Sequence, residues 1–113
     1  MDKLNRYPQL IQQILRHHEI LANKNPEESI EAHVICDHDR HRYMLFDTGW
    51  WDKRRVRKPT IYVQIRDNKI WIEEDWTEDG IATELLAAGV PKEDIVLAFH
   101  HPIMRPLTEF AVA

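Results

Sequence analysis

The rest of this chain is arranged around residues Thr60–Asp75, TIYVQIRDNKIWIEED. Apolar and polar residues alternate on either side of Asp67-Asn68, which is the pattern of two strands joined by a two-residue turn. Asp and Asn tolerate the positive φ that this turn requires, because their short side chains bond to the nearby backbone. A hairpin with one apolar face results, and other elements must cover that face. The predicted pairs are Ile65 with Ile70, Val63 with Ile72, Gln64 with Trp71 and Tyr62 with Glu73.

The beginning of the chain is predicted to be an amphipathic helix from about Asp2 to about Leu21. Pro8 interrupts its pattern, and a proline is tolerated in a helix only within the first turn. The helix should therefore either begin near Tyr7 or bend at that point. Its inward-facing residues recur at steps of three and four: Leu4, Tyr7, Ile11, Ile14, Leu15 and His18.

Two further strands are predicted between this helix and the hairpin. The segment Ile30–Asp37 alternates as a first strand, and Arg42–Trp50 forms a second strand with apolar residues on both faces, so it is central or covered. The Arg-rich segment Lys53–Lys58 either connects this strand to the hairpin or extends the third strand backwards. These strands complete a four-stranded antiparallel meander.

A second helix is predicted after the hairpin, with Ile81, Leu85 and Leu86 at helical spacing. Thr77 or Asp79 can cap its exposed amides. Its end is expected at Gly89, in the left-handed conformation, with Pro91 beyond it.

The last residues of the chain are expected to pack closely. Pro91–Asp94 should form one further turn, Ile95–Phe99 a buried strand or extended segment, and His100–Pro106 a rigid loop. The apolar end Thr108–Ala113 should be tied down against the core or in a subunit contact. The predicted fold class is therefore α+β: an N-terminal helix, an antiparallel β-meander of about four strands, then a C-terminal helix and a short extended segment, in one domain spanning residues 1–113.

Composition excludes several classes of protein. Apolar residues make up 43% and charged residues 30% of the 113 residues, and no apolar run approaches the ~20 residues of a membrane span. The first residues lack the apolar region of a signal peptide, and the single Cys36 cannot form an intramolecular disulfide. We therefore expect a cytoplasmic protein with no membrane contact. A net charge of -4 weighs against nucleic-acid binding by this domain alone.

Histidine is frequent, with seven residues, and this suggests a metal site. The run Asp37–His41, DHDRH, could place two imidazoles and a carboxylate on one ion, but the same residue types suit a solvated hairpin loop, which we prefer. His100 and His101 follow a buried-looking strand, at a position where a general base could lie. A structural role for this pair, such as bonding to backbone carbonyls, is the preferred interpretation.

Acidic residues offer a weaker possibility. Glu73–Asp75 with Lys69 could hold Mg²⁺, although acidic residues on the outer face of a hairpin also deter edge-to-edge aggregation. The chain has no glycine-rich phosphate loop and no nucleophile in a recognisable setting. We expect no catalytic residues, no metal and no cofactor.

The strongest candidate for a functional surface combines tryptophan with positive charge. Five cations lie within six positions, from Lys53 to Lys58, directly after Trp50 and Trp51. Trp and Arg dominate interface hot spots and also stack on single-stranded bases, whereas the plainer interpretation is one core Trp and a solvated loop; we weigh the two equally. Trp71 and Tyr62 lie on the hairpin face opposite the apolar one, which suggests self-association. The candidate partner or DNA contacts are Trp50, Trp51, Arg54, Arg55, Arg57 and Trp71.

Four strings also resemble a known family: KIWI (69–72), TEDGIA (77–82), GVPKEDIVLAF (89–99) and FAVA (110–113). Together with the opening MDKLNRYPQLIQQIL and the strand RHRYML, they make nearly the whole chain similar to the XisI family, the fdxN element excision controlling factors. The resemblance implies a small α+β protein linked to programmed excision of a DNA element, acting beside a separate nuclease-like partner called XisH. It carries over no catalytic residues. Many relatives would be expected to have Gly where this chain has Asn68.

Three hypotheses follow. The first is a non-enzymatic accessory protein that binds an XisH-type partner and so controls excision, with DNA reached through the complex. The second is a recombination directionality factor that binds DNA directly through the basic residues 53–58. The third is a catalytic or metal-bearing nuclease subunit that uses His100, His101 or Glu73–Asp75.

Overall fold

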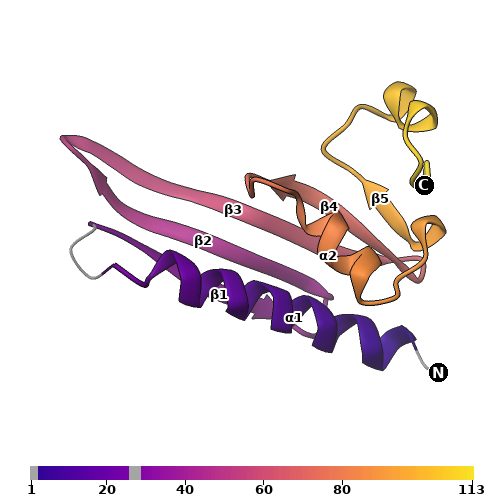
Figure 1. The fold of residues 1–113 in the computed structure, drawn as a ribbon, viewed down its shortest axis with the longest axis horizontal. Helices are drawn as coiled ribbons and strands as arrows, with labels where there is room; N and C mark the ends of the chain where they lie inside the picture. Colours follow the sequence, from indigo (N-terminus) through magenta and orange to yellow (C-terminus); the bar gives the residue numbers. More distant parts are fainter. Residues whose placement is uncertain (1–2, 26–28) are drawn as a thin grey trace.

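The computed structural model describes residues 3–25 and 29–113, with side chains from Arg6 onward. Its elements in chain order are α1 (Lys3–Ala22), β1 (Ile30–Asp37), β2 (Arg42–Trp51), β3 (Arg54–Arg66), β4 (Lys69–Asp75), α2 (Ile81–Ala87), the 3-10 helix η1 (Lys92–Asp94), β5 (Ile95–Leu97) and the 3-10 helix η2 (Pro102–Leu107). Within the described residues the strands form one sheet in the order β1-β2-β3-β4-β5. Figure 1 shows α1 and α2 on the same face of this sheet. The predicted α+β class is confirmed.

The hairpin of β3 and β4 is present, with one change of register. Asp67 and Asn68 have φ angles of 55° and 61°, as the two-residue turn requires. The three predicted pairs nearest the turn are confirmed, whereas Tyr62 pairs with Glu74, so its predicted pairing with Glu73 is wrong. The cause is a β-bulge, which places one extra residue, Glu73, in β4.

The four-stranded antiparallel meander is confirmed, and its third strand is longer than the hairpin alone. The Arg-rich segment continues β3 back to Arg54, which decides between the two interpretations of that segment. A tight turn joins β2 to β3, and Asp52 in this turn has a φ of 57°. Strand β2 lies between β1 and β3, in agreement with the apolar residues on both its faces.

The hydrophobic core lies between the sheet and the two helices. Tyr7, Ile11 and Leu15 of α1 are buried against sheet residues that include Leu45 and Ile61. This inner face of the meander is the apolar face predicted for the hairpin. No helix within the described residues is long and apolar enough to cross a membrane.

Helix α1 begins at Lys3 and contains Pro8, so of the two alternatives for this proline the start near Tyr7 is wrong. Pro8 removes one backbone donor close to the helix end, and burial of Tyr7 and Ile11 on either side of it offsets that loss. The predicted first residue, Asp2, and the side chain of Leu4 lie outside the described part of the chain.

Helix α2 ends as predicted but begins differently. Gly89 has a φ of 96°, its N–H donates to Leu86 O at 3.0 Å and Val90 N–H donates to Leu85 O at 3.0 Å, which together form a Schellman motif. Asp79 and Thr77 were predicted as caps, and this is wrong, because Asp75 at the end of β4 takes that role. Its carboxylate accepts from the N–H groups of Thr77, at 2.9 Å, and Ile81, at 2.8 Å.

The C-terminal residues return along the sheet. Strand β5 adds to β4 in parallel, and η1 forms the turn expected before it. Ala111 N–H donates to Ile95 O at 2.9 Å, and Phe110 packs against the core. The prediction that the chain end is tied down against the core is confirmed.

Candidate functional site

The far end of the β2–β3 hairpin, residues 49–58, projects beyond the rest of the sheet and is called the arm here. Strand β1 begins at Ile30, opposite Gly49, and β4 ends at Asp75, opposite Ile61. Within the described strands, Trp50 and Trp51 therefore pair only with Arg55 and Arg54. Ser29, just before β1, also bonds to the backbone of Trp50 at the base of the arm. Figure 1 shows this end of the hairpin reaching past the helices. The arm is supported at its base and open to solvent on both faces.

Both tryptophans of the arm are exposed. Trp50 pairs with Arg55 and Trp51 with Arg54, and neighbouring residues of a strand point to opposite faces. The exposed fraction is 50% for Trp50 and 67% for Trp51. The plainer interpretation, in which one Trp packs in the core and the arginines solvate a loop, is therefore wrong, because the whole segment is a strand that extends away from the core.

The pair of Trp50 and Arg55 is partly ordered before any partner binds. The Arg55 guanidinium carbon lies 5.2 Å from the centre of the Trp50 ring, and its Nη1 donates to Gly49 O at 3.2 Å. A cation over an indole face is an attractive arrangement. It presents a flat aromatic surface edged by a guanidinium, which can stack on a ring or bind a carboxylate or phosphate.

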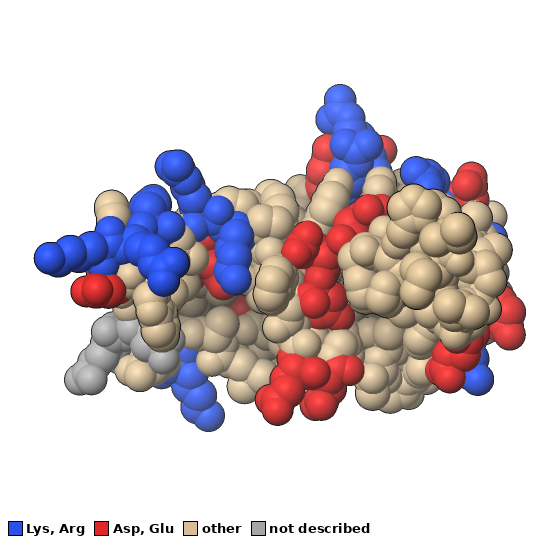
Figure 2. All heavy atoms as spheres, turned by 90° about the horizontal axis from the view of Figure 1, so that it is seen from above, with Lys and Arg blue, Asp and Glu red and all other residues tan. Residues whose placement is uncertain are grey.

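The positive charge of the arm is not neutralised by ion pairs within the described part of the chain. Figure 2 shows the Lys and Arg side chains gathered at this end, with acidic side chains concentrated elsewhere on the same face. Among the described residues, no ion pair involves the arm cations, although Lys58 Nζ lies 4.7 Å from the Trp76 ring centre. An anionic partner would meet them without displacing an existing ion pair.

A shallow hollow of about 390 Å³ lies along the arm and combines apolar with cationic side chains. Ile30, Trp51 and Val56 contribute its apolar part, and Arg54 and Lys58 are exposed cations beside it. Asp47 also lines the hollow, and its carboxylate accepts from Thr60 Oγ1 at 2.8 Å. This combination suits an amphipathic surface with an acidic edge.

Trp71 does not join the arm residues. Its exposed fraction is only 5%, its Nε1 donates to Arg66 O at 3.0 Å, and the Arg66 guanidinium lies 3.8 Å from the ring centre. Arg105 of the C-terminal segment covers the ring as well, at 5.7 Å. The chain itself therefore buries Trp71, which corrects its place among the candidate contact residues and removes it as an argument for self-association.

The histidine candidates have structural surroundings. His101 Nδ1 accepts from the N–H of Ile103 at 3.2 Å and so caps η2, while the ring of His100 lies 4.6 Å from that of Phe99. The expected structural role of His101 is present, although it bonds to an amide rather than a carbonyl.

The run Asp37–His41 forms the tight turn between β1 and β2. The carboxylate of Asp37 accepts from the Arg40 N–H at 3.1 Å and pairs with its guanidinium at 3.3 Å. The backbone N–H of Arg40, with its side chain, lowers the pKa of Asp37. No group of three or more His, Cys, Asp or Glu residues within the described chain could hold a metal ion.

The acidic run at the end of β4 is also engaged in the fold. Glu73 accepts from Gln64 Nε2 at 2.8 Å, Glu74 accepts from Trp76 Nε1, and Asp75 caps α2. These carboxylates are spread over three different contacts and do not converge on one point.

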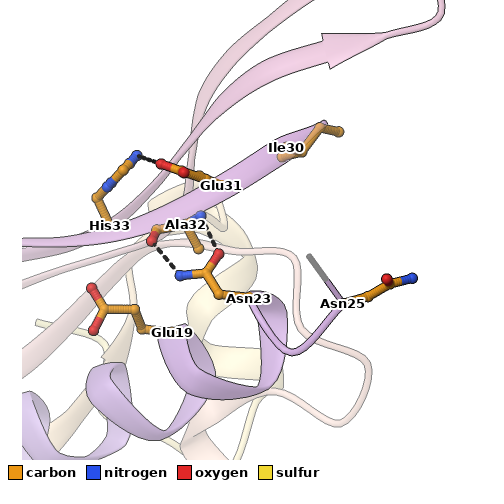
Figure 3. Close-up of a pocket in the computed structure, with 7 residues that line it drawn as sticks. All are labelled: Glu19, Asn23, Asn25, Ile30, Glu31, Ala32 and His33. Atoms are coloured by element: carbon orange, nitrogen blue, oxygen red, sulfur yellow. Dashed lines mark hydrogen bonds and ion pairs between the residues drawn. The ribbon is translucent and has the colours of Figure 1, made fainter. Parts of the chain in front are cut away.

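A second surface was not predicted from the sequence and lies at the free edge of β1. Asn23 Oδ1 accepts from Ala32 N–H at 2.8 Å, and Asn23 Nδ2 donates to Ala32 O at 2.9 Å, as Figure 3 shows. Glu19 Oε2 accepts from the next outward amide, Val34 N–H, at 2.8 Å. These side chains occupy backbone groups that another strand could pair with. The polar run after the helix predicted only a loop.

Fold and site together define an α+β protein that presents a basic, tryptophan-bearing arm. A family model described as XisI protein matches residues 1–112. The chain is therefore a member of the XisI family, and the resemblance noted in its sequence is confirmed.

Two solved structures are close relatives. The fdxN element excision controlling factor XisI from Anabaena variabilis ATCC 29413 is 45% identical, with a TM-score of 0.86, and the match covers 99% of this chain and 100% of that one. A XisI-like protein from the same organism is 32% identical, with a TM-score of 0.86, and the match covers 97% of this chain and 99% of that one. No curated protein matches the sequence.

Proposed function

We propose that this chain is a non-enzymatic controlling factor for excision of a DNA element, and that it acts by binding an XisH-type, nuclease-like protein through the arm. The relative that is 45% identical is named an excision controlling factor, which supports the first part. The arm supports the second part. The observation that carries the proposal is the exposed pair of Trp50 and Arg55 on a strand that projects beyond the sheet.

The arm has the chemistry of a protein-binding hot spot. Trp and Arg are the residue types whose truncation most often costs a complex 2 kcal/mol or more, on the order of 30-fold in affinity. Two exposed indoles offer apolar area, and the free cations around them steer an acidic partner toward the arm. The antiparallel pairing of β2 with β3 and the bonds of Arg55 already place these groups, which reduces the ordering needed on binding.

The experiment is co-purification with an XisH-type, nuclease-like protein at low and at high salt. It uses the wild type and the double variant Trp50→Ala/Trp51→Ala. We expect a stoichiometric wild-type complex that survives high salt and weakens at least tenfold in the double variant. Ile20→Ala is the matched control, since Ile20 is 68% exposed but lies on α1 and is not part of the arm. The proposal would be contradicted if the wild type did not bind, or if the wild type, the double variant and Ile20→Ala all bound equally well.

Direct DNA binding through residues 53–58 is the second candidate, because the free cations beside an exposed indole also suit phosphates and unstacked bases. Each phosphate contact adds about one unit to the slope of log affinity against log salt. Retention on DNA that declines steeply with salt, and that Arg54→Gln/Arg57→Gln reduces, would favour this candidate. No retention at low salt would remove it.

A further inference from the structure

The C-terminal segment carries a cluster of exposed apolar side chains at the end of the molecule away from the arm. We call this cluster the C-terminal surface. Two of its residues are almost fully exposed, Ile103 at 75% and Leu107 at 79%. Exposed apolar side chains are ordinary when scattered singly, but a group of them on one short segment indicates an interaction site. The residues of the C-terminal surface are Phe99, Ile103, Met104, Leu107 and Val112.

The geometry of η2 explains why Ile103, Met104 and Leu107 point outward. A 3-10 helix has three residues per turn, so residues three apart lie above one another. Arg105 is the residue that faces the protein: its guanidinium donates to Ala98 O at 3.3 Å and to Val112 O at 3.4 Å, and its Nε donates to His100 O at 3.1 Å. The other two rows, which include Met104 with Leu107, are therefore turned to solvent.

The segment is also almost without free charge. Between residues 98 and 113 the only charged side chains are Arg105 and Glu109, and Arg105 is used within the segment. Figure 2 shows a broad surface of uncharged side chains at the end opposite the basic arm. Depletion of charge at an apolar patch is typical of the centre of a protein interface, and of homodimer interfaces above all.

We propose that the C-terminal surface binds a second copy of this chain about a two-fold axis. Identical groups face each other across such an axis, so a self-complementary surface must be close to neutral near its centre. The C-terminal surface satisfies this condition. The arm does not, because its cations would repel their own copies. This inference is independent of the proposed function.

Pairing between sheet edges is not the route of association that the structure favours. Asn23 and Glu19 occupy the outward groups of β1 at one edge. At the other edge Ala111 forms a parallel bridge with Val96 of β5. Packing of two C-terminal surfaces needs no free strand edge, and the internal bonds of Arg105 keep η2 in shape before association.

The test is the molar mass of the purified chain by light scattering during gel filtration, across a concentration range from about 1 to 100 μM. We expect the wild type to have twice the 13.5 kDa of one chain. The variants Leu107→Glu and Ile103→Glu, both at exposed positions, should be monomers or dissociate at concentrations at least tenfold higher, with unchanged circular dichroism. Their melting temperature should equal that of the wild type only at concentrations where the wild type is itself dissociated. Ile20→Glu, at an equally exposed apolar position on α1, should remain dimeric.

Each other outcome overturns the inference. A wild-type monomer at 100 μM shows that no second copy binds, and a dimer unaffected by either glutamate shows that another surface is used. If the purified wild type is a monomer and Leu107→Glu no longer binds the nuclease-like partner, the C-terminal surface belongs to that partner. Arm variants that lose the dimer would likewise overturn the inference, because the arm would then be the contact between the copies.

Discussion

Tyr7 Oη donates a 2.5 Å hydrogen bond to Asp94 Oδ2, and this buried contact joins residues 87 positions apart in the chain. Tyr7 belongs to α1 and Asp94 to η1, so the bond connects the first helix to the turn that leads into β5. Both residues are buried. The two ends of the sequence therefore share one polar contact inside the core.

Replacing Tyr7 with phenylalanine should lower the free energy of unfolding by about 1–3 kcal/mol, because the buried carboxylate of Asp94 loses a donor. Urea denaturation followed by tryptophan fluorescence measures the change. Tyr43→Phe is the control: the Tyr43 hydroxyl is equally buried but has no hydrogen-bond partner among the described residues, so its removal should be neutral or stabilising. Equal losses in both variants would contradict the assigned role of the bond.

Ionisation of the Tyr7 hydroxyl should also lower the stability of the fold in alkaline solution. Burial, followed by the hydrogen bond and the charge of Asp94, raises the pKa of Tyr7 from 10.0 to about 12. Because the phenol ionises more easily in the unfolded chain than in the folded protein, its contribution to stability is fully present below pH 10. This contribution, about 2–3 kcal/mol, is lost as the pH rises from 10 to about 12. Denaturation at several pH values should show a steeper decline for the wild type than for Tyr7→Phe. Parallel curves would exclude Tyr7 as the cause.

Asp75→Ala should cost about 1–2 kcal/mol, since the carboxylate accepts from the first amide of α2, Ile81 N–H, and from Thr77 N–H in the turn before the helix. Asp79→Ala is the matched control, because Asp79 is exposed and was the cap expected from the sequence. Thermal unfolding followed by circular dichroism compares them. A larger loss in the Asp79 variant would mean that the structure assigns the cap wrongly.

Asn23→Ala combined with Glu19→Ala should uncover the edge of β1 and raise self-association. The expected readout is light scattering that grows with concentration and time, together with a loss of about 1–2 kcal/mol in stability. Gln13→Ala, an exposed amide on the same helix, should show neither effect. A double variant that stays at the wild-type size would mean that these side chains do not protect the edge.

Gly49→Ala should weaken the base of the arm. Gly49 has a φ of 152°, and an added Cβ would lie 2.0 Å from Ser29 O, the atom that accepts from Trp50 N–H at 3.1 Å. We expect a loss of at least about 2 kcal/mol. Gly80→Ala shares a positive φ, but its Cβ would lie 3.6 Å from the nearest side-chain atom, so its cost should be limited to backbone strain of about 1–2 kcal/mol. Chemical denaturation measures the free energy of unfolding of both variants. A larger loss in Gly80→Ala than in Gly49→Ala would contradict the predicted clash with Ser29.

Features set by neighbouring residues were predictable from the sequence. The turn at Asp67-Asn68, the end of α2 at Gly89 and the alternation of β1 each depend on residues a few positions apart. The bulge at Glu73 was not predictable, because a two-residue period carries no sign of an extra residue. The Asp75 cap was missed because the carboxylate reaches its helix from the end of a strand.

The candidate surfaces also depend partly on neighbouring residues, which the sequence reveals, and partly on distant segments, which it does not. Trp50 and Trp51 were identified by residue type, but their exposure depends on the strand continuing past the sheet, and Arg and Lys fit a strand or a loop equally well. The burial of Trp71 depends on Arg105, which belongs to a distant segment that folds back over the ring. The C-terminal surface requires the three-residue period of η2, which its prolines and apolar residues did not indicate.

The arm and the C-terminal surface lie toward opposite ends of a molecule whose longest dimension is 42 Å (Figure 1). Two copies joined at their C-terminal surfaces would therefore hold their arms far apart and facing away from each other. Such a pair is bivalent. Once one arm is bound, the other is confined near a second site, and this effective concentration can raise avidity about 10²–10⁴-fold over a single arm when the two sites match the spacing.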